Sequence, residues 1–361
     1  MNIEFDSAQC EKIKTDARAW WDGKLDRPLI HVTLTGRPPG QPEPPIPSRP
    51  FISFYDESVS TEAIIARWDY VLSCYRFLGD AFPAVWPNFG AGVLAAFMGA
   101  TLKNDIPAGT VWFQPAQEQE IGDIRFHYDP ENPWFQRISD IYRAGLKHWQ
   151  GQVQMGMTDL GGNLDILSSF RPSEKLLLDL YDHPDEVKRL TSEAHEAWWS
   201  YFNEFNTMLQ PVNLGYSAWD GMLSETPFYM LQCDFAYMIS PAMFDEFVKP
   251  ELQASCQRLD HAFYHLDGPG QLPHLDSLLS ISELKGIQWI PGAGQPDMAH
   301  WPQVYRKIRK AGKLIQIFGS FKTLDALTDQ LGSAQGICLI SQQDISEEQE
   351  VLTGLHRYGA I

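Results

Sequence analysis

The sequence has few cysteines, and none of them stands near another. Five thiols occur, an odd number, and no C-x-x-C pair is present. A disulfide framework or a cysteine-only zinc site needs cysteines in pairs at short spacing. We therefore expect reduced thiols and neither of these two kinds of site.

Long apolar runs are also missing. No run approaches the roughly 20 residues that span a bilayer as a helix, and residues 1–6 lack the basic start and apolar stretch of a signal peptide. These absences predict a cytoplasmic protein that has no membrane segment.

Positive charge is scarce. Lysine and arginine together number 28 against 46 acidic residues, which gives a formal net charge of -18. A phosphate backbone or an anionic membrane surface would repel such a chain. We therefore expect no nucleic acid and no membrane as partner, and instead a small-molecule ligand or a protein with a basic patch.

Several widespread catalytic motifs are absent. There is no Walker A loop, and the glycines at 90–92 and 292–294 lack the flanking pattern of a dinucleotide-binding fingerprint. No G-x-S-x-G element is present, so a serine hydrolase of that type is not indicated. The chemistry must be sought elsewhere.

What is present is a regular alternation of short apolar runs with helical stretches. Such a pattern favours βα units around a parallel sheet. Eight runs predict strands, which is the number that a closed (β/α)₈ barrel requires. They lie at 27–34, 84–86, 153–157, 212–216, 262–265, 286–290, 314–318 and 336–340.

The rest of the chain fits around that barrel. Amphipathic helices are predicted at 7–22 and 60–78, and residues 95–145 form an insertion over the barrel mouth, with a hairpin that uses 111–113 and 124–127. With 44% hydrophobic residues, the chain has material for a large core. We expect an α/β fold with one TIM-type barrel domain over residues 1–361.

Polar and aromatic residues gather at the predicted strand ends, where a barrel of this kind keeps its active site. Each of them has a bland alternative as a helix cap, a barrel plug or a loop contact. Several carboxylates in one mouth would repel each other unless a cation compensates, which motivates a metal site. The candidates are Trp86, Asn88, Asp159, Tyr216, Trp219, Asp220, His265, Asp267, Gln288, Trp289, Gln316 and Asp344.

His265-x-Asp267 is the most suggestive of these patterns. Alternate residues of a strand point to the same side, so the imidazole and the carboxylate can approach one ion. Asp344, at another strand end, would complete three ligands and leave a fourth position open, as in catalytic zinc sites. The alternative is a simple turn at 267–270, with His265 donating to a backbone carbonyl.

Four segments resemble the uroporphyrinogen decarboxylase-like superfamily, which includes that decarboxylase and cobalamin-dependent methyltransferases. The stretch from Asp234 to Phe244, followed by Phe247 and Pro250, is similar to the family pattern D-x-x-x-x-x-S-P-x-x-F…F-x-x-P. Residues 176–184 and the lead-in 21–28 resemble further family segments, and His265-Leu266-Asp267-Gly268 stands where the family commonly reads H-x-C-G. The resemblance implies a distorted (β/α)₈ barrel with its site in a deep mouth cleft.

The methyltransferase branch of the family holds zinc with the histidine and cysteine of H-x-C and a later cysteine. Matched by position, these ligands are His265, Asp267 and Asp344 here, so carboxylates replace both thiolates. Hard carboxylates suit a metal that acts on oxygen. The decarboxylase branch carries an arginine-rich N-terminal motif that binds substrate carboxylates, and residues 31–37 do not match it.

We therefore expect a corrinoid-dependent methyltransferase that moves a methyl group from a small O-methylated or alcohol donor to a corrinoid protein. Zinc or another divalent metal would act as Lewis acid, and Trp86, Trp219 and Trp289 would hold the substrate together with Asn88, Gln288 and Gln316. Tyr216 and Gln316 would stabilise the leaving oxyanion.

Two other functions stay open. One is a metal-independent decarboxylase of the uroporphyrinogen type, in which Asp159 or Asp220 stabilises a cationic intermediate. The other is a barrel that binds a corrinoid or an aromatic ligand without turnover. The aromatic residues 198–201 fit either a core or a homodimer interface.

Overall fold

The computed structural model describes residues 2–361, and its central element is a seven-stranded sheet. The strand order is β2-β1-β11-β10-β9-β8-β7, and all neighbours are parallel except β1 and β2. Helices cover the sheet, so its strands are largely apolar and buried, as parallel sheets require. The bounds are β1 Leu29–Thr35, β2 Arg76–Gly79, β7 Phe228–Gln232, β8 His261–Asp267, β9 Leu284–Ile290, β10 Leu314–Phe318 and β11 Ile337–Asp344.

The sheet is not closed, so the predicted eight-stranded barrel is not confirmed. Two predicted strands pair only with each other, as the short parallel pair β3 (Ala84–Val85) and β6 (Gln154–Met155). Two strands of the sheet, β2 and β7, were absent from the prediction. The mixed α/β class with a parallel sheet is confirmed.

The predicted strand at 212–216 is wrong for a local reason. Side chains occupy the positions that a strand ladder would need: the amide of Asn213 bonds both the N–H and the carbonyl of Met155, at 3.2 and 2.8 Å. The Gln154 amide likewise donates to the carbonyl of Gly215 at 2.7 Å and accepts from the N–H of Leu214 at 3.0 Å. Only an isolated bridge between Tyr216 and Ser224 remains.

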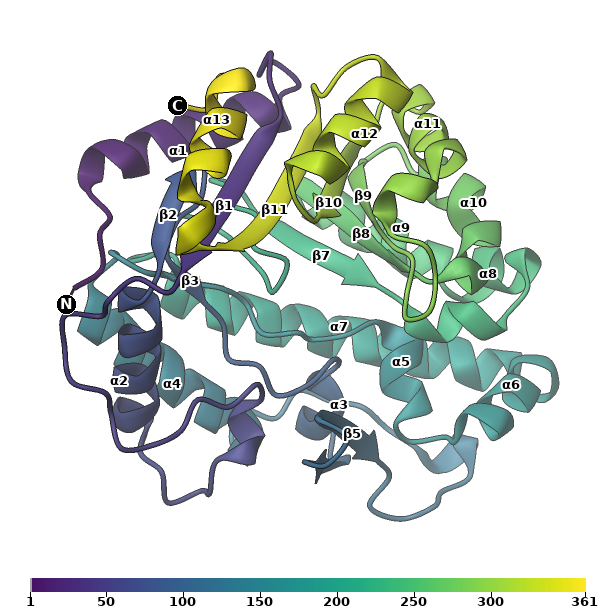
Figure 1. Cartoon of the computed structure of the whole chain (residues 1–361). Helices are drawn as coiled ribbons and strands as arrows, with labels where there is room; N and C mark the ends of the chain where they lie inside the picture. Colours follow the sequence, from purple (N-terminus) through teal and green to yellow (C-terminus); the bar gives the residue numbers. More distant parts are fainter. Residues whose placement is uncertain (1) are drawn as a thin grey trace.

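Helices pack around the sheet. In Figure 1, α1 and α13 lie beside β1, the long α7 runs beneath the sheet, and α2 lies against α4. Ser240 accepts from the N–H of Met243 and Pro241 opens α8, the serine cap and first-position proline that favour a helix start. The helices are α1 Ser7–Trp21, α2 Thr61–Ser73, α3 Leu94–Phe97, α4 Pro133–Trp149, α5 Asn163–Ser168, α6 Ser173–Asp182, α7 Pro184–Leu209, α8 Pro241–Phe247, α9 Lys249–Arg258, α10 Leu275–Leu279, α11 Pro302–Lys310, α12 Phe321–Leu331 and α13 Glu348–Arg357.

The insertion contains a hairpin, but with partners other than those predicted. Strand β4 (Thr101–Asp105) pairs antiparallel with β5 (Thr110–Gln114), whereas residues 124–127 lie outside any strand. The short turn at 106–109 brings 110–114 back onto the adjacent 101–105, a more local closure than one that spans residues 114–124.

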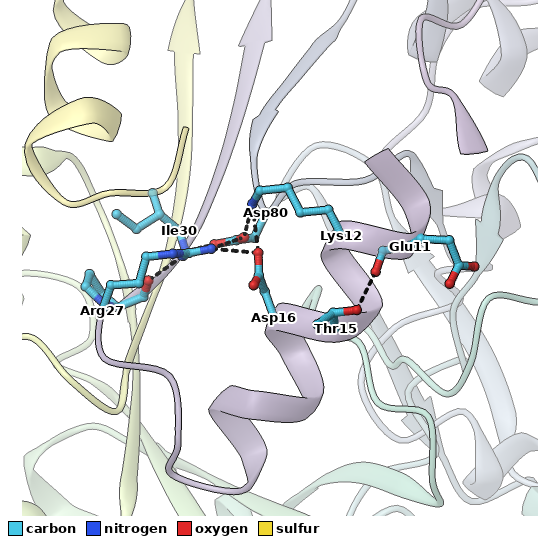
Figure 2. Close-up of polar contacts among 8 residues, drawn as sticks. Glu11, Lys12, Thr15, Asp16, Arg27, Ile30 and Asp80 are labelled. Carbon is cyan, nitrogen blue, oxygen red and sulfur yellow. Dashed lines mark hydrogen bonds and ion pairs between the residues drawn. The ribbon is translucent and has the colours of Figure 1, made fainter. Parts of the chain in front are cut away.

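A buried ion-pair network fixes the N-terminal side of the sheet (Figure 2). The carboxylate of Asp80 is fully buried and accepts two hydrogen bonds from the Arg27 guanidinium, at 2.7 and 2.8 Å. It also accepts from the N–H of Ile30 at 2.8 Å and from Lys12 at 3.3 Å. Because Arg27 reaches Asp16 as well, at 2.8 Å, the network joins α1, β1 and the end of β2.

None of the helices over residues 2–361 combines the length and the apolar composition that crossing a membrane would demand.

Candidate functional site

Strand β8 carries both residues of the H-x-D motif. His265 and Asp267 are two positions apart, so their side chains leave the same face of the sheet, and Asp267 is the last residue of the strand. The next residue, Gly268, has φ +77° and still donates its N–H to the carbonyl of Ile290 at 2.8 Å. A side chain at 268 would also meet the ring of Tyr237 at 3.0 Å, so glycine is required there.

Asp234 is the third member of the group. It begins the short 3₁₀ turn Asp234–Met238 directly after β7, the neighbour of β8. One ligand atom from each of Asp234, His265 and Asp267 lies within 4.8 Å of the others. The structure therefore brings His265 and Asp267 together as predicted, and adds a carboxylate that sequence reasoning missed.

Asp344 does not belong to this group, which corrects the predicted ligand set. It ends β11, and its Oδ1 accepts from the N–H and hydroxyl of Ser346 at 2.9 and 2.6 Å. These bonds lower the pKa of Asp344 and cap the turn that follows. Three strand intervals separate β8 from β11, about 14 Å at the usual strand spacing, whereas β7 is adjacent.

A row of polar side chains crosses the sheet at the level of His265. Gln232, His265, Gln288 and Gln316 are direct register partners on β7, β8, β9 and β10, so they share one face. His265 Nδ1 contacts Gln288 Oε1, Gln288 Nε2 donates to Gln316 Oε1 at 2.6 Å, and Gln316 Nε2 donates to the carbonyl of Asp220 at 3.0 Å. On the other side, Gln232 Nε2 donates to Asp159 Oδ1 at 3.1 Å.

This row corrects two predicted substrate contacts. Gln288 and Gln316 are fully buried, and their amides bond His265, each other and the Asp220 backbone. The polar strand positions were correctly placed near His265, but the two amides support the histidine and do not face a substrate.

The carboxylates near the site lack a cationic partner. Burial raises the pKa of Asp220 to about 7. Burial, with the charge of Asp234 as the next cause, raises the pKa of Asp159 to about 7 and that of Asp165 to about 8. No lysine or arginine within residues 2–361 contributes to these shifts, so the predicted gathering of uncompensated carboxylates is present.

Asp165 and Asp234 were not among the predicted residues. Asp165 accepts from the N–H groups of Asp234 and Phe235 at 3.0 and 2.7 Å, so it holds the start of the turn that presents Asp234. Burial also raises the pKa of Asp234, helped by Asp267 and opposed by His265, although its side chain keeps contact with solvent. The sequence feature that could have pointed to Asp234 is the mainly apolar run 228–232, because a polar residue that follows such a run is a candidate strand-end residue.

The predicted aromatic residues separate into two groups. Trp219 lies edge-on to His265 with ring centroids 5.1 Å apart, and its buried Nε1 has no partner within residues 2–361. Trp289 is fully buried and packs against Trp301 at 5.1 Å, because it alternates with Gln288 and so leaves the opposite face of β9. The substrate role of Trp289 is therefore wrong, and that of Trp86, which is half-buried, stays a prediction.

Two further predicted residues serve the structure. The Asn88 amide donates to the carbonyl of Pro50 at 3.0 Å and accepts from the N–H of Gly90 at 3.0 Å. Tyr216 pairs with Ser224, whose hydroxyl meets His261 at the start of β8, the end opposite to Asp267. Neither position supports the predicted role, because one amide is engaged by loop backbone and the other residue lies at the wrong strand end.

Comparison with known proteins shows that a solved structure shares this fold. No protein-family model matches the chain, and no curated protein matches it either. Among solved structures, a methyltransferase from Methanosarcina mazei is similar, with a TM-score of 0.61 and 14% sequence identity. The alignment covers 96% of this chain and 99% of that one, so the two share a fold over nearly their whole lengths.

Proposed function

We propose that this chain is a metal-dependent methyltransferase that moves a methyl group from a small O-methylated or alcohol donor to the corrinoid of a partner protein. The observation that carries the proposal is the convergence of Asp234, His265 and Asp267 at the carboxyl ends of β7 and β8. The shared fold with a methyltransferase supports the same reaction class.

The residues fit a divalent metal. His265 uses Nδ1 toward Gln288, which leaves Nε2 for an ion, and Asp234 and Asp267 offer carboxylate oxygens. Such a nitrogen and oxygen set suits Zn²⁺, Mn²⁺ or Fe²⁺, and an ion would offset the uncompensated negative charge around it. When bound, the metal would supply a Lewis acid toward the oxygen of the methyl donor.

Asp159 is suited to supply a proton to the leaving oxygen. With a pKa of about 7, this carboxyl is protonated in a large fraction of molecules at neutral pH. Its Oδ1 accepts from the N–H groups of Gly92 and Gly161 and from Gln232, so we place the proton on Oδ2. When the methyl carbon–oxygen bond breaks, the electron pair would stay on the oxygen, which would take this proton from Asp159, and solvent would protonate Asp159 again. The corrinoid of the partner protein would supply the acceptor for the methyl group.

A methyl-transfer assay tests the proposal. The full chain, reconstituted with zinc, is incubated with methanol or a methoxylated phenol and free cob(I)alamin, and methylcobalamin is followed by its absorbance. We expect turnover that falls at least about 100-fold in His265→Ala and is retained in Asp344→Ala, the matched control at a strand end outside the group.

Two results would contradict the proposal. One is unchanged turnover in His265→Ala. The other is no methyl transfer from either donor while uroporphyrinogen is decarboxylated without added metal, which would support the decarboxylase alternative.

A further inference from the structure

The buried row of His265, Gln288 and Gln316 on β8, β9 and β10 is linked by hydrogen bonds. The contact at the Gln316 end fixes which group donates in each of them. Gln316 Nε2 donates to the backbone carbonyl of Asp220 at 3.0 Å, and a carbonyl oxygen can only accept. The Gln316 amide is therefore oriented with its NH₂ toward Asp220 and its oxygen toward Gln288.

The orientation of the Gln316 amide fixes the orientation of the Gln288 amide. Gln316 Oε1 accepts from Gln288 Nε2 at 2.6 Å, so Gln288 must present its oxygen to the other side. That oxygen faces His265 Nδ1. Because both glutamines are fully buried, no water competes for these positions, and reversing one amide alone would set like groups against each other.

We infer that Gln316 and Gln288 form a relay that fixes the proton of neutral His265 on Nδ1 and so keeps Nε2 unprotonated. An acceptor at Nδ1 requires a hydrogen there, and a neutral imidazole carries only one. The free lone pair on Nε2 is what a metal or an acidic proton needs. Gln288 and Gln316 thus act as positioning residues through His265, and Gln316 does so without touching it.

The consequence for metal binding rests on the proposed function, but the tautomer itself does not. A histidine in water exchanges its proton between the two nitrogens, and a site that requires Nε2 loses affinity when the tautomer is not fixed. Partners of this kind change metal affinity 10- to 100-fold in known sites. The same row also extends to β7, where Gln232 bonds Asp159 and not His265, so the chain offers a matched control.

The test is nitrogen NMR of the metal-free full chain with labelled histidine, at a pH above which the His265 signals no longer change. His265 is assigned from the signal lost in His265→Asn. We expect a protonated Nδ1 and an unprotonated Nε2 in the wild type. Gln316→Leu should mix or invert the tautomer, because Gln288 is then free to turn its NH₂ toward His265, whereas Gln232→Leu should keep the wild-type tautomer.

A second variant covers the case in which Gln316→Leu does not fold. Gln288→Glu keeps an acceptor oxygen toward His265 at the same size, and the Nδ1-protonated form should persist. Zinc affinity measured by calorimetry should fall 10- to 100-fold in Gln288→Leu.

Protonated Nε2 in the wild type or in Gln288→Glu would overturn the relay, as would a pure wild-type tautomer in Gln316→Leu. Failure of zinc to bind the wild type, with the tautomer as expected, would instead count against the proposed function alone.

Discussion

Two regions of the molecule bury carboxylates in opposite ways. Asp80, in the network of Figure 2, is surrounded by Arg27, Lys12 and a backbone N–H, and these partners outweigh burial and lower its pKa. Asp220 has no cation, and burial raises its pKa to about 7. The difference shows that burial alone does not decide the charge of a carboxylate, and that the second region is built to hold protons or to await a positive ion.

The largest expected effect comes from breaking the compensated region. Asp80→Asn removes the fully buried negative partner of Arg27 and leaves this partly buried cation with Asp16 alone as counterion. Losing one member of a buried pair typically costs about 3–5 kcal/mol. Urea unfolding of the variant should show a loss of that size. A loss below about 1 kcal/mol would mean that the network contributes no more than a surface ion pair.

In the region without cationic partners, neutralising a carboxylate should have the opposite effect on stability. The pKa of Asp220 is raised on folding, so its stabilising contribution is complete below about pH 4 and is lost as the pH rises to about 7. Asp220→Asn removes this loss, so the free energy of unfolding of the variant relative to wild type should improve by about 2 kcal/mol from pH 5 to pH 8. Denaturant titrations at both pH values measure this, and a constant difference would contradict the raised pKa.

A smaller effect is expected at Asp344. Its side chain caps the turn after β11 through Ser346, and removal of such a cap lowers stability. Because the side chain is exposed, Asp344→Ala should lose less stability in thermal or urea unfolding than Asp80→Asn, and it should bind zinc like the wild type. Weakened zinc binding in this variant would show that Asp344 is a zinc ligand, as the sequence predicted.

The smallest effect should come from Asp234. In the metal-free protein its charge repels Asp267 and Asp165, but the side chain is exposed and solvent screens it. Asp234→Asn should therefore raise the free energy of unfolding by no more than about 0.5 kcal/mol at pH 8. A clear destabilisation without metal would show that Asp234 holds the fold and is not simply an uncompensated carboxylate.

The sequence predicted strands by their apolar runs, and seven of the eight predicted runs appear as strands. It also located His265 and Asp267 together, because two residues of one strand keep their relation whatever the topology. It failed where strand order mattered: Asp344 and Asp234 both follow strands, and only the sheet places β7 beside β8 and β11 three strands away. The relay of Gln288 and Gln316 likewise depends on register between strands, which no local pattern encodes.

We propose that Asp234, His265 and Asp267 hold one divalent metal. The decisive experiment is a calorimetric titration of the metal-free full chain with Zn²⁺, in the wild type, Asp234→Asn and Asp344→Asn. We expect one site per chain in the wild type, preserved in Asp344→Asn and weakened at least about tenfold in Asp234→Asn. No binding to the wild type, or a loss with Asp344→Asn in place of Asp234→Asn, would contradict it.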